Sequence, residues 1–279
     1  MPVILDGKAL AAKRKEEIAC KVKNLSRKPG LAVILVGENP ASRIYVNNKR
    51  RDCAECGFYD EEYTLPEQTG ERELLELIEV LNEREDIDGI LVQLPLPKHM
   101  DERKVLLAID PEKDVDGFHP MNMGKLVSGE EGFLPCTPTG VMELLEEYGI
   151  DPQGKHCVVL GRSNIVGKPM SLLMLRKHAT VTICHSKTPD LGAVCRQADI
   201  LISAVGREGL VTADMVKEGA VVVDVAINRN AEGKLCGDCE IAAYGKSSAF
   251  TPVPGGVGVM TRAVLMENTL KAALNHGVH

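Results

Sequence analysis

The sequence predicts an α/β protein of two domains, each built on a mostly parallel β-sheet. Short apolar runs alternate with amphipathic stretches along most of the chain, which is the pattern of β–α–β units. Residues 110–139, rich in Pro, Gly and Asp, interrupt this alternation as a domain junction does. Residues 156–169 then give a buried strand, a tight turn and a helix start, which is typical of the first unit of a doubly wound sheet.

In the first half of the chain, apolar periodicity marks the helices and short apolar runs mark the strands. Apolar residues at helical spacing predict a helix over 7–25, with Asp6 as its N-cap. The run 31–36 ends at Gly37 and predicts a buried strand. Further helices are expected at 41–57, 71–83 and 101–109, and further strands at 59–65 and 89–93. The segment Leu94-Pro95-Leu96-Pro97 must be a loop.

After the junction the alternation resumes. A helix is expected at 139–148, and strands are expected near 157–160, 180–184, 199–203 and 220–225, with helices between them. The final helix, 261–274, follows the glycine-rich segment 254–258, and we expect it to pack back on the first domain. We therefore place the first domain at 1–120, the second at 139–260, and assign the helix within 261–279 to the first.

Composition and charge exclude several classes of protein. The net charge of −7 and pI of about 5.6 argue against binding to nucleic acid or acidic membranes, which requires basic patches. No apolar run reaches transmembrane length, and residues 1–8 lack the regions of a signal peptide. Nine cysteines, an odd number, indicate reduced thiols and a cytoplasmic protein. Because no His or Cys cluster accompanies Cys53/Cys56 or Cys236/Cys239, we interpret these pairs as packing thiols and predict no metal site.

The turn at 161–169 is a candidate phosphate cradle. Pro169 is compatible with a helix start, where free N–H groups and the helix dipole favour an anion. Ser163 replaces the second glycine of Gly-x-Gly-x-x-Gly, so the turn alone also fits an ordinary strand-to-helix connection. The next strand ends in His185-Ser186-Lys187-Thr188 without a carboxylate for a ribose 2′-hydroxyl, and Arg162 offers a charged fork for a 2′-phosphate. These features favour NADP over NAD, unless the residues are simply solvated.

A second constellation lies in the first domain. Ser42, Tyr45 and Lys49 are spaced three and four residues apart, so one helix face presents all three. Spacing alone favours a solvated face over a catalytic one. Gln93 follows a buried strand of a parallel sheet, and ligands bind at the carboxyl ends of such strands.

The junction carries two carboxylates, Asp114 and Asp116, directly before Gly117. Carboxylates in such a loop have three ordinary roles: they hold a metal, cap a turn or bond a substrate amidine. The spacing does not decide among these roles.

Seven motifs occur in order along the chain. They are Ser42-x-x-Tyr45-x-x-x-Lys49 and the segments 92–97, 111–117, 135–138, 161–169, 185–188 and 254–258. Through them the chain closely resembles the bifunctional methylenetetrahydrofolate dehydrogenase/methenyltetrahydrofolate cyclohydrolase family, nearly end to end. The resemblance implies NADP-dependent oxidation of 5,10-methylenetetrahydrofolate and hydrolysis of the 5,10-methenyl product to 10-formyltetrahydrofolate. It also implies a folate cleft between the two domains, a Rossmann-type NADP-binding second domain and a homodimer.

The resemblance assigns roles position by position. Lys49 and Gln93 match the catalytic lysine and glutamine of the family, Tyr45 its stacking tyrosine, and Asp116 its folate-anchoring aspartate. Ser42 and Pro254, Gly255 and Gly256 are expected to contact the folate, and Arg162 and Ser186 the 2′-phosphate. The other expected NADP contacts are Gly161, Ser163, Ile165, His185, Ala204, Val205, Gly206, Ile227, Asp238 and Thr261.

The chain departs from the family pattern at Val259, Ala226 and Cys239, which bear on fine cofactor contacts and leave the reaction in place. Two other functions fit the residues. One is a different dehydrogenase on the same architecture, such as a shikimate or amino-acid type, which would not need Tyr45, Lys49 and Gln93 together. The other is a non-catalytic nucleotide-binding regulator, against which the intact Lys49 and Asp116 argue.

Overall fold

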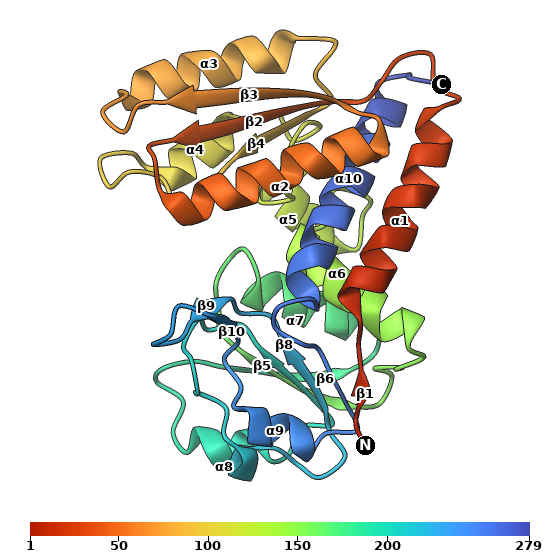
Figure 1. Cartoon of the computed structure of the whole chain (residues 1–279), viewed down its shortest axis with the longest axis vertical. Helices are drawn as coiled ribbons and strands as arrows, with labels where there is room; N and C mark the ends of the chain where they lie inside the picture. The colour runs from red at the N-terminus through yellow and green to blue at the C-terminus, as the bar shows by residue number, and fades with distance from the viewer. The chain divides into compact units, whose positions relative to one another are not determined.

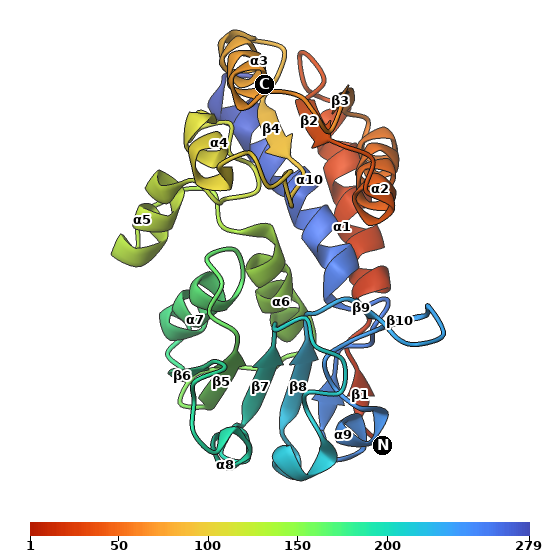
Figure 2. The same ribbon diagram turned by 90° about the vertical axis from the view of Figure 1, so that its left-hand side faces the viewer.

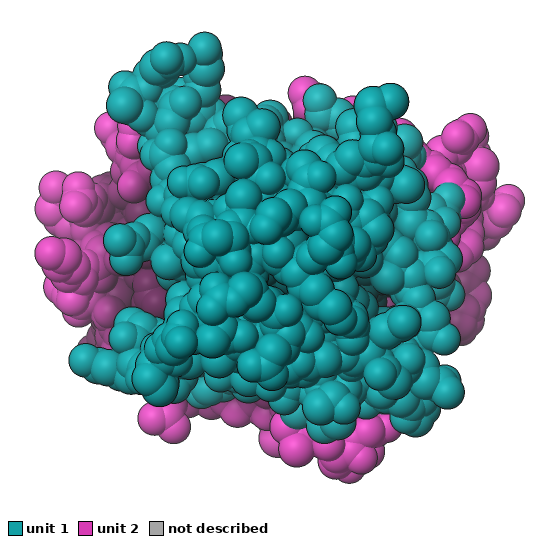
Figure 3. Space-filling model, turned by 90° about the horizontal axis from the view of Figure 1, so that it is seen from below, with its two compact units in different colours: residues 1–11, 137–261 teal, residues 12–136, 262–279 magenta. Residues whose placement is uncertain are grey.

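The chain forms two compact units, each with its own parallel sheet (Figures 1 and 3). The computed structural model describes residues 1–279, apart from the side chain of Ala41. Unit 1 comprises Met1–Ala11 and Thr137–Thr261, and unit 2 comprises Ala12–Cys136 and Arg262–His279. Among the described residues, no helix has both the length and the hydropathy needed to span a bilayer.

Unit 2 is built on a three-stranded parallel sheet with the strand order β3-β2-β4. Its strands are β2 (Gly30–Val36), β3 (Tyr59–Leu65) and β4 (Gly89–Val92). Its helices are most of α1 (Gly7–Val22) and of α10 (Val257–Asn275), together with α2 (Pro40–Cys56), α3 (Glu71–Glu83), α4 (Glu102–Ala108) and α5 (Pro120–Ser128).

Both faces of this sheet are covered, and β2 is therefore buried along its whole length. Leu31, Val33 and Leu35 share one core with side chains of α1, α2 and α10. The alternate residues of β2, 32, 34 and 36, share a second core with α3 and α4. This arrangement follows from the two-residue period of a strand, which sends successive side chains to opposite faces.

Unit 1 holds a six-stranded parallel sheet with the order β1-β11-β8-β7-β5-β6. The strands are β1 (Val3–Ile4), β5 (His156–Leu160), β6 (Thr180–Cys184), β7 (Ile200–Ser203), β8 (Val221–Asp224) and β11 (Ala249–Phe250). The helices are α6 (Cys136–Glu147), α7 (Gly167–Arg176), α8 (Leu191–Cys195) and α9 (Ile241–Gly245), with a 3-10 turn at Ala213–Met215. Strands β9 (Asn228–Arg229) and β10 (Leu235–Cys236) form a separate antiparallel pair.

The order of the strands in unit 1 reverses at β5. Strand β6 pairs with one edge of β5, and β7 pairs with the other (Figure 2). In open parallel sheets, ligands bind outside the carboxyl ends of the strands at such a switch point. The residues that follow β5 and β7 therefore define the expected cofactor site.

The predicted fold class, α/β with parallel sheets, is confirmed. Helix α5 and the short strands β1, β9, β10 and β11 were not predicted. Helix α5 lacks the usual N-cap residue types, because His119 takes that position and accepts a hydrogen bond from the N–H of Met121, while Pro120 opens the helix. The short strands carry too few residues for a periodic pattern.

The division of the chain differs from the expected boundaries at 120 and 139. Residues 1–11 belong to unit 1, because β1 pairs in parallel with β11: Val3 lies opposite Ala249, and Ile4 lies opposite Phe250. Residues 121–136 belong to unit 2. Helices α1 and α10 each begin in unit 1 and continue into unit 2.

Candidate active site

The turn after β5 brings two glycines into close contact with neighbouring backbone. Gly161 has φ +116°, and a Cβ there would lie 2.6 Å from the carbonyl oxygen of Ala204, which follows β7. A Cβ on Gly167, where α7 begins, would lie 2.3 Å from the carbonyl oxygen of Gly161. Only glycine permits both approaches, so the turn is a tight backbone cradle at the switch point.

Polar side chains around this cradle have different roles. Ser163 Oγ accepts hydrogen bonds from the N–H groups of Val166 (3.1 Å) and Gly167 (3.2 Å), and so holds the turn in shape. Lys168 donates to Asn164 Oδ1 at 2.7 Å. Arg162 is exposed and has no hydrogen bond or ion pair with any described residue. Its guanidinium is therefore available to an anion.

The turn after β6 presents a hydroxyl without a carboxylate. His185 N–H donates to Thr188 Oγ1 at 2.9 Å, and Lys187 N–H donates to His185 Nδ1 at 3.1 Å, so the turn is tied within itself. Ser186 lies exposed between them. A glycine cradle, an unpaired Arg162 and an exposed Ser186 fit a dinucleotide that carries a 2′-phosphate.

The buried carboxylate of Asp238 holds the loop after β7 in its conformation. This carboxylate is fully buried and accepts hydrogen bonds from the N–H groups of residues 205–207, at 2.7–3.3 Å, and from the side chains of Ser203 and Asn228. Because both of its oxygens accept hydrogen bonds from protein groups, Asp238 positions the loop. Val205 and Ile227 are 46% and 41% exposed, respectively, and offer the apolar surface of this region.

Four other predicted contacts lie in the first turns of α10 or just before it. Thr261 Oγ1 lies 2.9 Å from Thr137 Oγ1, so a hydrogen bond joins α6 to the part of α10 that belongs to unit 1. In the segment before α10, Pro254 is exposed, and the carbonyl of Gly255 accepts a hydrogen bond from Lys8 N–H at 3.1 Å. Gly256 is buried.

The second constellation is assembled in unit 2 around Lys49. Lys49 lies on α2, is only 9% exposed, and donates to Gln93 Oε1 at 3.1 Å. Gln93 directly follows β4, and its Nε2 donates to Leu94 O at 2.8 Å, which fixes the direction of its amide. The helix face predicted from spacing is therefore not simply solvated. Ser42 is buried near the start of α2, and Tyr45 is partly exposed one turn further on.

The electrostatics around Lys49 favour neutral groups. Burial lowers the pKa of Lys49 below its ordinary value, while the charge of Asp116 opposes that shift. Burial also raises the pKa of Asp116, and the charge of Lys49 opposes it. An amine that loses its proton more readily than an ordinary lysine is suited to accept a proton near neutral pH.

Cys136 is a further member of this site that the sequence argument did not assign. Its buried thiol contacts the Asp116 carboxyl group and lies 3.3 Å from Val115 O. Asn268 of α10 donates to Val115 O (2.8 Å) and Leu134 O (3.1 Å), which ties the two loops together. Cys136 lies within the 135–138 motif, but a cysteine next to a proline does not by itself indicate a functional residue.

The two junction aspartates have separate roles. Asp114 is buried and accepts hydrogen bonds from Phe118 N–H (3.1 Å), His119 N–H (2.8 Å) and Asn122 Nδ2 (2.8 Å), so it holds the turn that leads into α5. Asp116 instead faces Lys49 and Cys136. Asp114 therefore caps a turn, whereas Asp116 takes no part in that turn and remains a candidate for binding a ligand.

Asp114→Ala is expected to lower the free energy of unfolding by about 3 kcal/mol, because it leaves two N–H groups and a buried amide without their charged acceptor. Urea unfolding followed by circular dichroism measures this change. A loss below about 1 kcal/mol would contradict the structural role.

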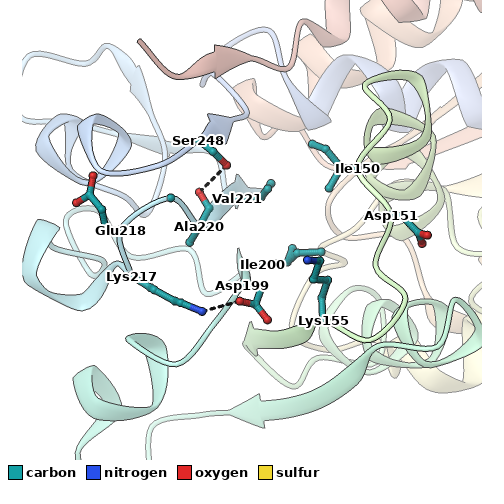
Figure 4. Close-up of a pocket in the computed structure, with 11 residues that line it drawn as sticks. Ile150, Asp151, Lys155, Asp199, Ile200, Lys217, Glu218, Ala220, Val221 and Ser248 are labelled. Atoms are coloured by element: carbon teal, nitrogen blue, oxygen red, sulfur yellow. Dashed lines mark hydrogen bonds and ion pairs between the residues drawn. The ribbon is translucent and has the colours of Figure 1, made fainter.

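Figure 4 shows a separate pocket of unit 1. It lies at the ends where the parallel strands begin, whereas the cradle follows the end of β5. Its volume is about 280 Å³, and its lining includes Lys155, Asp199, Lys217 and Ala220, which precede β5, β7 and β8. Lys217 Nζ and Asp199 Oδ1 are paired at 2.6 Å. The pocket therefore plays no part in the cofactor site.

Of the two predicted packing pairs, Cys53, Cys56 and Cys239 are buried, whereas Cys236 is partly exposed. Cys53 and Cys56 are buried in the core of unit 2, and Cys53 Sγ lies 3.8 Å from Met266 Sδ. Burial raises the pKa of Cys56 to about 12, which keeps this thiol protonated. Within the part of the chain that the structure describes, no three His, Cys, Asp or Glu side chains are grouped to hold a metal ion.

Comparison with known proteins covers almost the whole chain. Residues 5–116 match the family model of the tetrahydrofolate dehydrogenase/cyclohydrolase catalytic domain, and residues 135–277 match its NAD(P)-binding domain. A relative from Ruminiclostridium cellulolyticum, named bifunctional protein FolD, is 58% identical over 275 residues, which are 97% of each chain.

Two solved structures are similar over nearly their full lengths. The bifunctional FolD methylenetetrahydrofolate dehydrogenase/cyclohydrolase of Campylobacter jejuni has a TM-score of 0.96 and 52% identity, and the match covers 99% of each chain. The methylenetetrahydrofolate dehydrogenase-cyclohydrolase of Trypanosoma brucei, solved with NADP and an inhibitor, has a TM-score of 0.94 and 38% identity, covering 98% of each chain.

Proposed function

The chain belongs to the tetrahydrofolate dehydrogenase/cyclohydrolase family, and on that premise we propose which of its residues carry the two reactions. The enzyme oxidises 5,10-methylenetetrahydrofolate with NADP and hydrolyses the 5,10-methenyl product to 10-formyltetrahydrofolate. The observation that carries the assignment is the buried Lys49, held by Gln93 at 3.1 Å and facing Asp116.

The dehydrogenase step depends mainly on positioning. When bound, NADP supplies the hydride acceptor. Asp116 accepts hydrogen bonds from the amide and amine of the pterin, which fixes the orientation of the ring. Tyr45 stacks on the pterin or on the adjacent ring, while Ser42 and the segment 254–256 complete the folate contacts. The cradle from Gly161 to Gly167 holds the pyrophosphate, and Arg162 and Ser186 hold the 2′-phosphate.

The cyclohydrolase step requires proton transfer. The methenyl carbon is already electrophilic, so a water molecule adds to it once a base accepts the water proton. Neutral Lys49 accepts that proton, and the resulting ammonium returns it to the ring nitrogen as the carbon–nitrogen bond breaks. The proton of the added hydroxyl is released to solvent as the formyl C=O forms. Gln93 holds the amine in place without adding a negative charge that would raise its pKa.

Purified protein with 5,10-methylenetetrahydrofolate and NADP tests the function directly, when the absorbance of NADPH and of the methenyl product are followed separately. Both signals are expected, and the methenyl signal should decay as hydrolysis proceeds. Saturable NADP binding without turnover would instead support a nucleotide-binding regulator, and turnover of a hydroxy acid alone would support a different dehydrogenase.

Arg162→Ala is expected to weaken NADP binding by about 2 kcal/mol, roughly 30-fold in Kd, and to leave NAD binding nearly unchanged. The reason is that the guanidinium is exposed and has no partner among the described residues, so in this proposal its charge serves the 2′-phosphate, which NAD lacks. Isothermal titration with both cofactors measures the difference. Lys168→Ala is the matched control, because this cation lies in the same turn but is paired with Asn164. Equal loss for both cofactors would assign Arg162 to the pyrophosphate or to the fold.

We also propose a cytoplasmic homodimer. The described cysteines are all free, as expected in a reducing compartment, and the family resemblance supports the dimer. Light scattering of the purified protein at several concentrations tests the oligomeric state, and a mass equal to one chain would contradict it.

A further inference from the structure

Arg262 of α10 lies along the turn of α2 that carries Lys49. Its NH1 donates to the carbonyl oxygen of Asn48 at 3.3 Å and pairs with Asp52 Oδ2 at 2.5 Å. Asn48 immediately precedes Lys49, and Asp52 follows it by three residues on the same helix. The guanidinium is therefore bonded to one residue that precedes Lys49 in the helix and to one that follows it.

This anchor is nearly free of solvent. The side chain of Asp52 is 1% exposed and that of Arg262 is 14% exposed. Lys15 of α1 also pairs with Asp52, at 2.8 Å. Asp52 thus has two cations, one from each neighbouring helix, and it holds the guanidinium in a fixed place. Charges in such an environment interact more strongly than charges on the surface.

We propose that Arg262, held by Asp52, is a positioning residue that keeps Lys49 in its neutral, proton-accepting form for the hydrolysis step. The proposal rests on the role of Lys49 given above and adds a residue that controls it. A fixed cation near a lysine disfavours the ammonium form, because bringing two like charges together costs free energy.

The charges that face Lys49 come from four elements. Burial has the largest lowering effect on the pKa of Lys49; Asp116 of the junction loop, Cys136 at the start of α6 and Cys53 of α2 raise it, and Arg262 lowers it. Gln93 contributes no charge. Burial raises the pKa of both thiols, so they stay neutral near pH 7. The main opposing charges are then the carboxylate of Asp116 and the guanidinium of Arg262, whose charge is partly offset by the Asp52 carboxylate that holds it.

A purely structural role for Arg262 makes a different prediction. If the side chain only ties α10 to α2, its loss would reduce stability and turnover, but would leave the pH dependence of hydrolysis unchanged. If Arg262 acts through Lys49, the pH at which hydrolysis falls must move. Activity needs the neutral amine, so it is lost as the pH falls through the pKa of Lys49.

The test compares kcat/KM for hydrolysis of 5,10-methenyltetrahydrofolate across pH, after subtraction of the uncatalysed rate. Arg262→Gln is expected to move the acid limb upward by about one pH unit. Arg262→Lys keeps the charge and should retain the limb of the unmodified enzyme. Arg50→Gln is the matched control, because Arg50 adjoins Lys49 in sequence but pairs with Asp60 on another, exposed face. It should leave the limb unchanged.

A double variant protects the test against loss of folding. Asp52→Asn combined with Arg262→Gln removes both members of the pair and leaves no unbalanced carboxylate, and its limb should still move upward, by a smaller amount. A limb that coincides with that of the unmodified enzyme in both variants would overturn the proposal. Lys49→Met distinguishes failure of the Lys49 assignment from failure of the Arg262 proposal. If Lys49→Met retained hydrolysis, the role of Lys49 itself would be refuted. If Lys49→Met were inactive but the acid limb of Arg262→Gln did not move, only the role of Arg262 would be refuted.

Discussion

Lys49→Met is expected to reduce hydrolysis of 5,10-methenyltetrahydrofolate by about 100-fold or more, while part of the dehydrogenase activity survives. The two reactions make different demands on one site. A hydride leaves with its electrons, so oxidation needs no base at the reacting carbon. Hydrolysis must take a proton from water and return one to the opening ring. Methionine keeps the length of the side chain and removes the amine, so the methenyl intermediate should accumulate.

Two further variants sharpen this prediction. Lys49→Arg should not restore hydrolysis, because a guanidinium stays protonated and cannot accept the proton. Arg50→Met should retain both activities, because Arg50 lies on the same helix but is half exposed and pairs with Asp60 and Glu62. Separate absorbance traces for NADPH and for the methenyl compound provide the measurement. Full hydrolysis by Lys49→Met would exclude Lys49 as the proton acceptor.

Asp116→Ala is expected to reduce kcat/KM for folate by about 10- to 100-fold in both reactions, mainly through a higher KM, because hydrogen bonds to a charged acceptor contribute roughly 1.5–3 kcal/mol each. NADP affinity and thermal stability should stay near those of the unmodified protein. Asp116 also raises the pKa of Lys49, so the acid limb of the remaining hydrolysis should move to lower pH.

Asp114→Ala is the natural counterpart to this variant. The two carboxylates lie two residues apart, yet Asp114 accepts hydrogen bonds from the following turn, whereas Asp116 faces Lys49. One substitution should therefore cost stability and the other activity. A thermal unfolding scan and a folate titration on both variants distinguish them, and collapse of the Asp116→Ala fold would return Asp116 to a structural role.

Elements long enough to carry an apolar run or a periodic pattern were predictable from the sequence, and shorter elements were not. Strand β2 and helix α3 match their predicted bounds within a residue or two, because long apolar runs and helical spacing carry a strong signal. Strand β1 has two residues and depends on a partner at β11, so its position is set by tertiary pairing.

The site divides in the same way. Spacing placed Ser42, Tyr45 and Lys49 on one helix face, but burial and the contact with Gln93 decided that the face is more than solvated surface. Asp114 and Asp116 could not be separated until their hydrogen-bond partners were known. Arg262 lies more than 200 residues from Asp52 in the chain, and no local pattern links two such positions.

Helices α1 and α10, which contain residues of both units, constrain when each unit can fold during synthesis. The ribosome releases β1 first, but its partner β11 is about 245 residues behind it. Unit 2 likewise cannot fold fully before α10 is synthesised, because side chains of α10 complete the core around β2. Unit 1 cannot be completed before β11 is translated, nor unit 2 before α10, so the two should reach their native state almost together. A nascent chain halted before α10 is thus expected to be sensitive to protease throughout, rather than to contain one finished, resistant half.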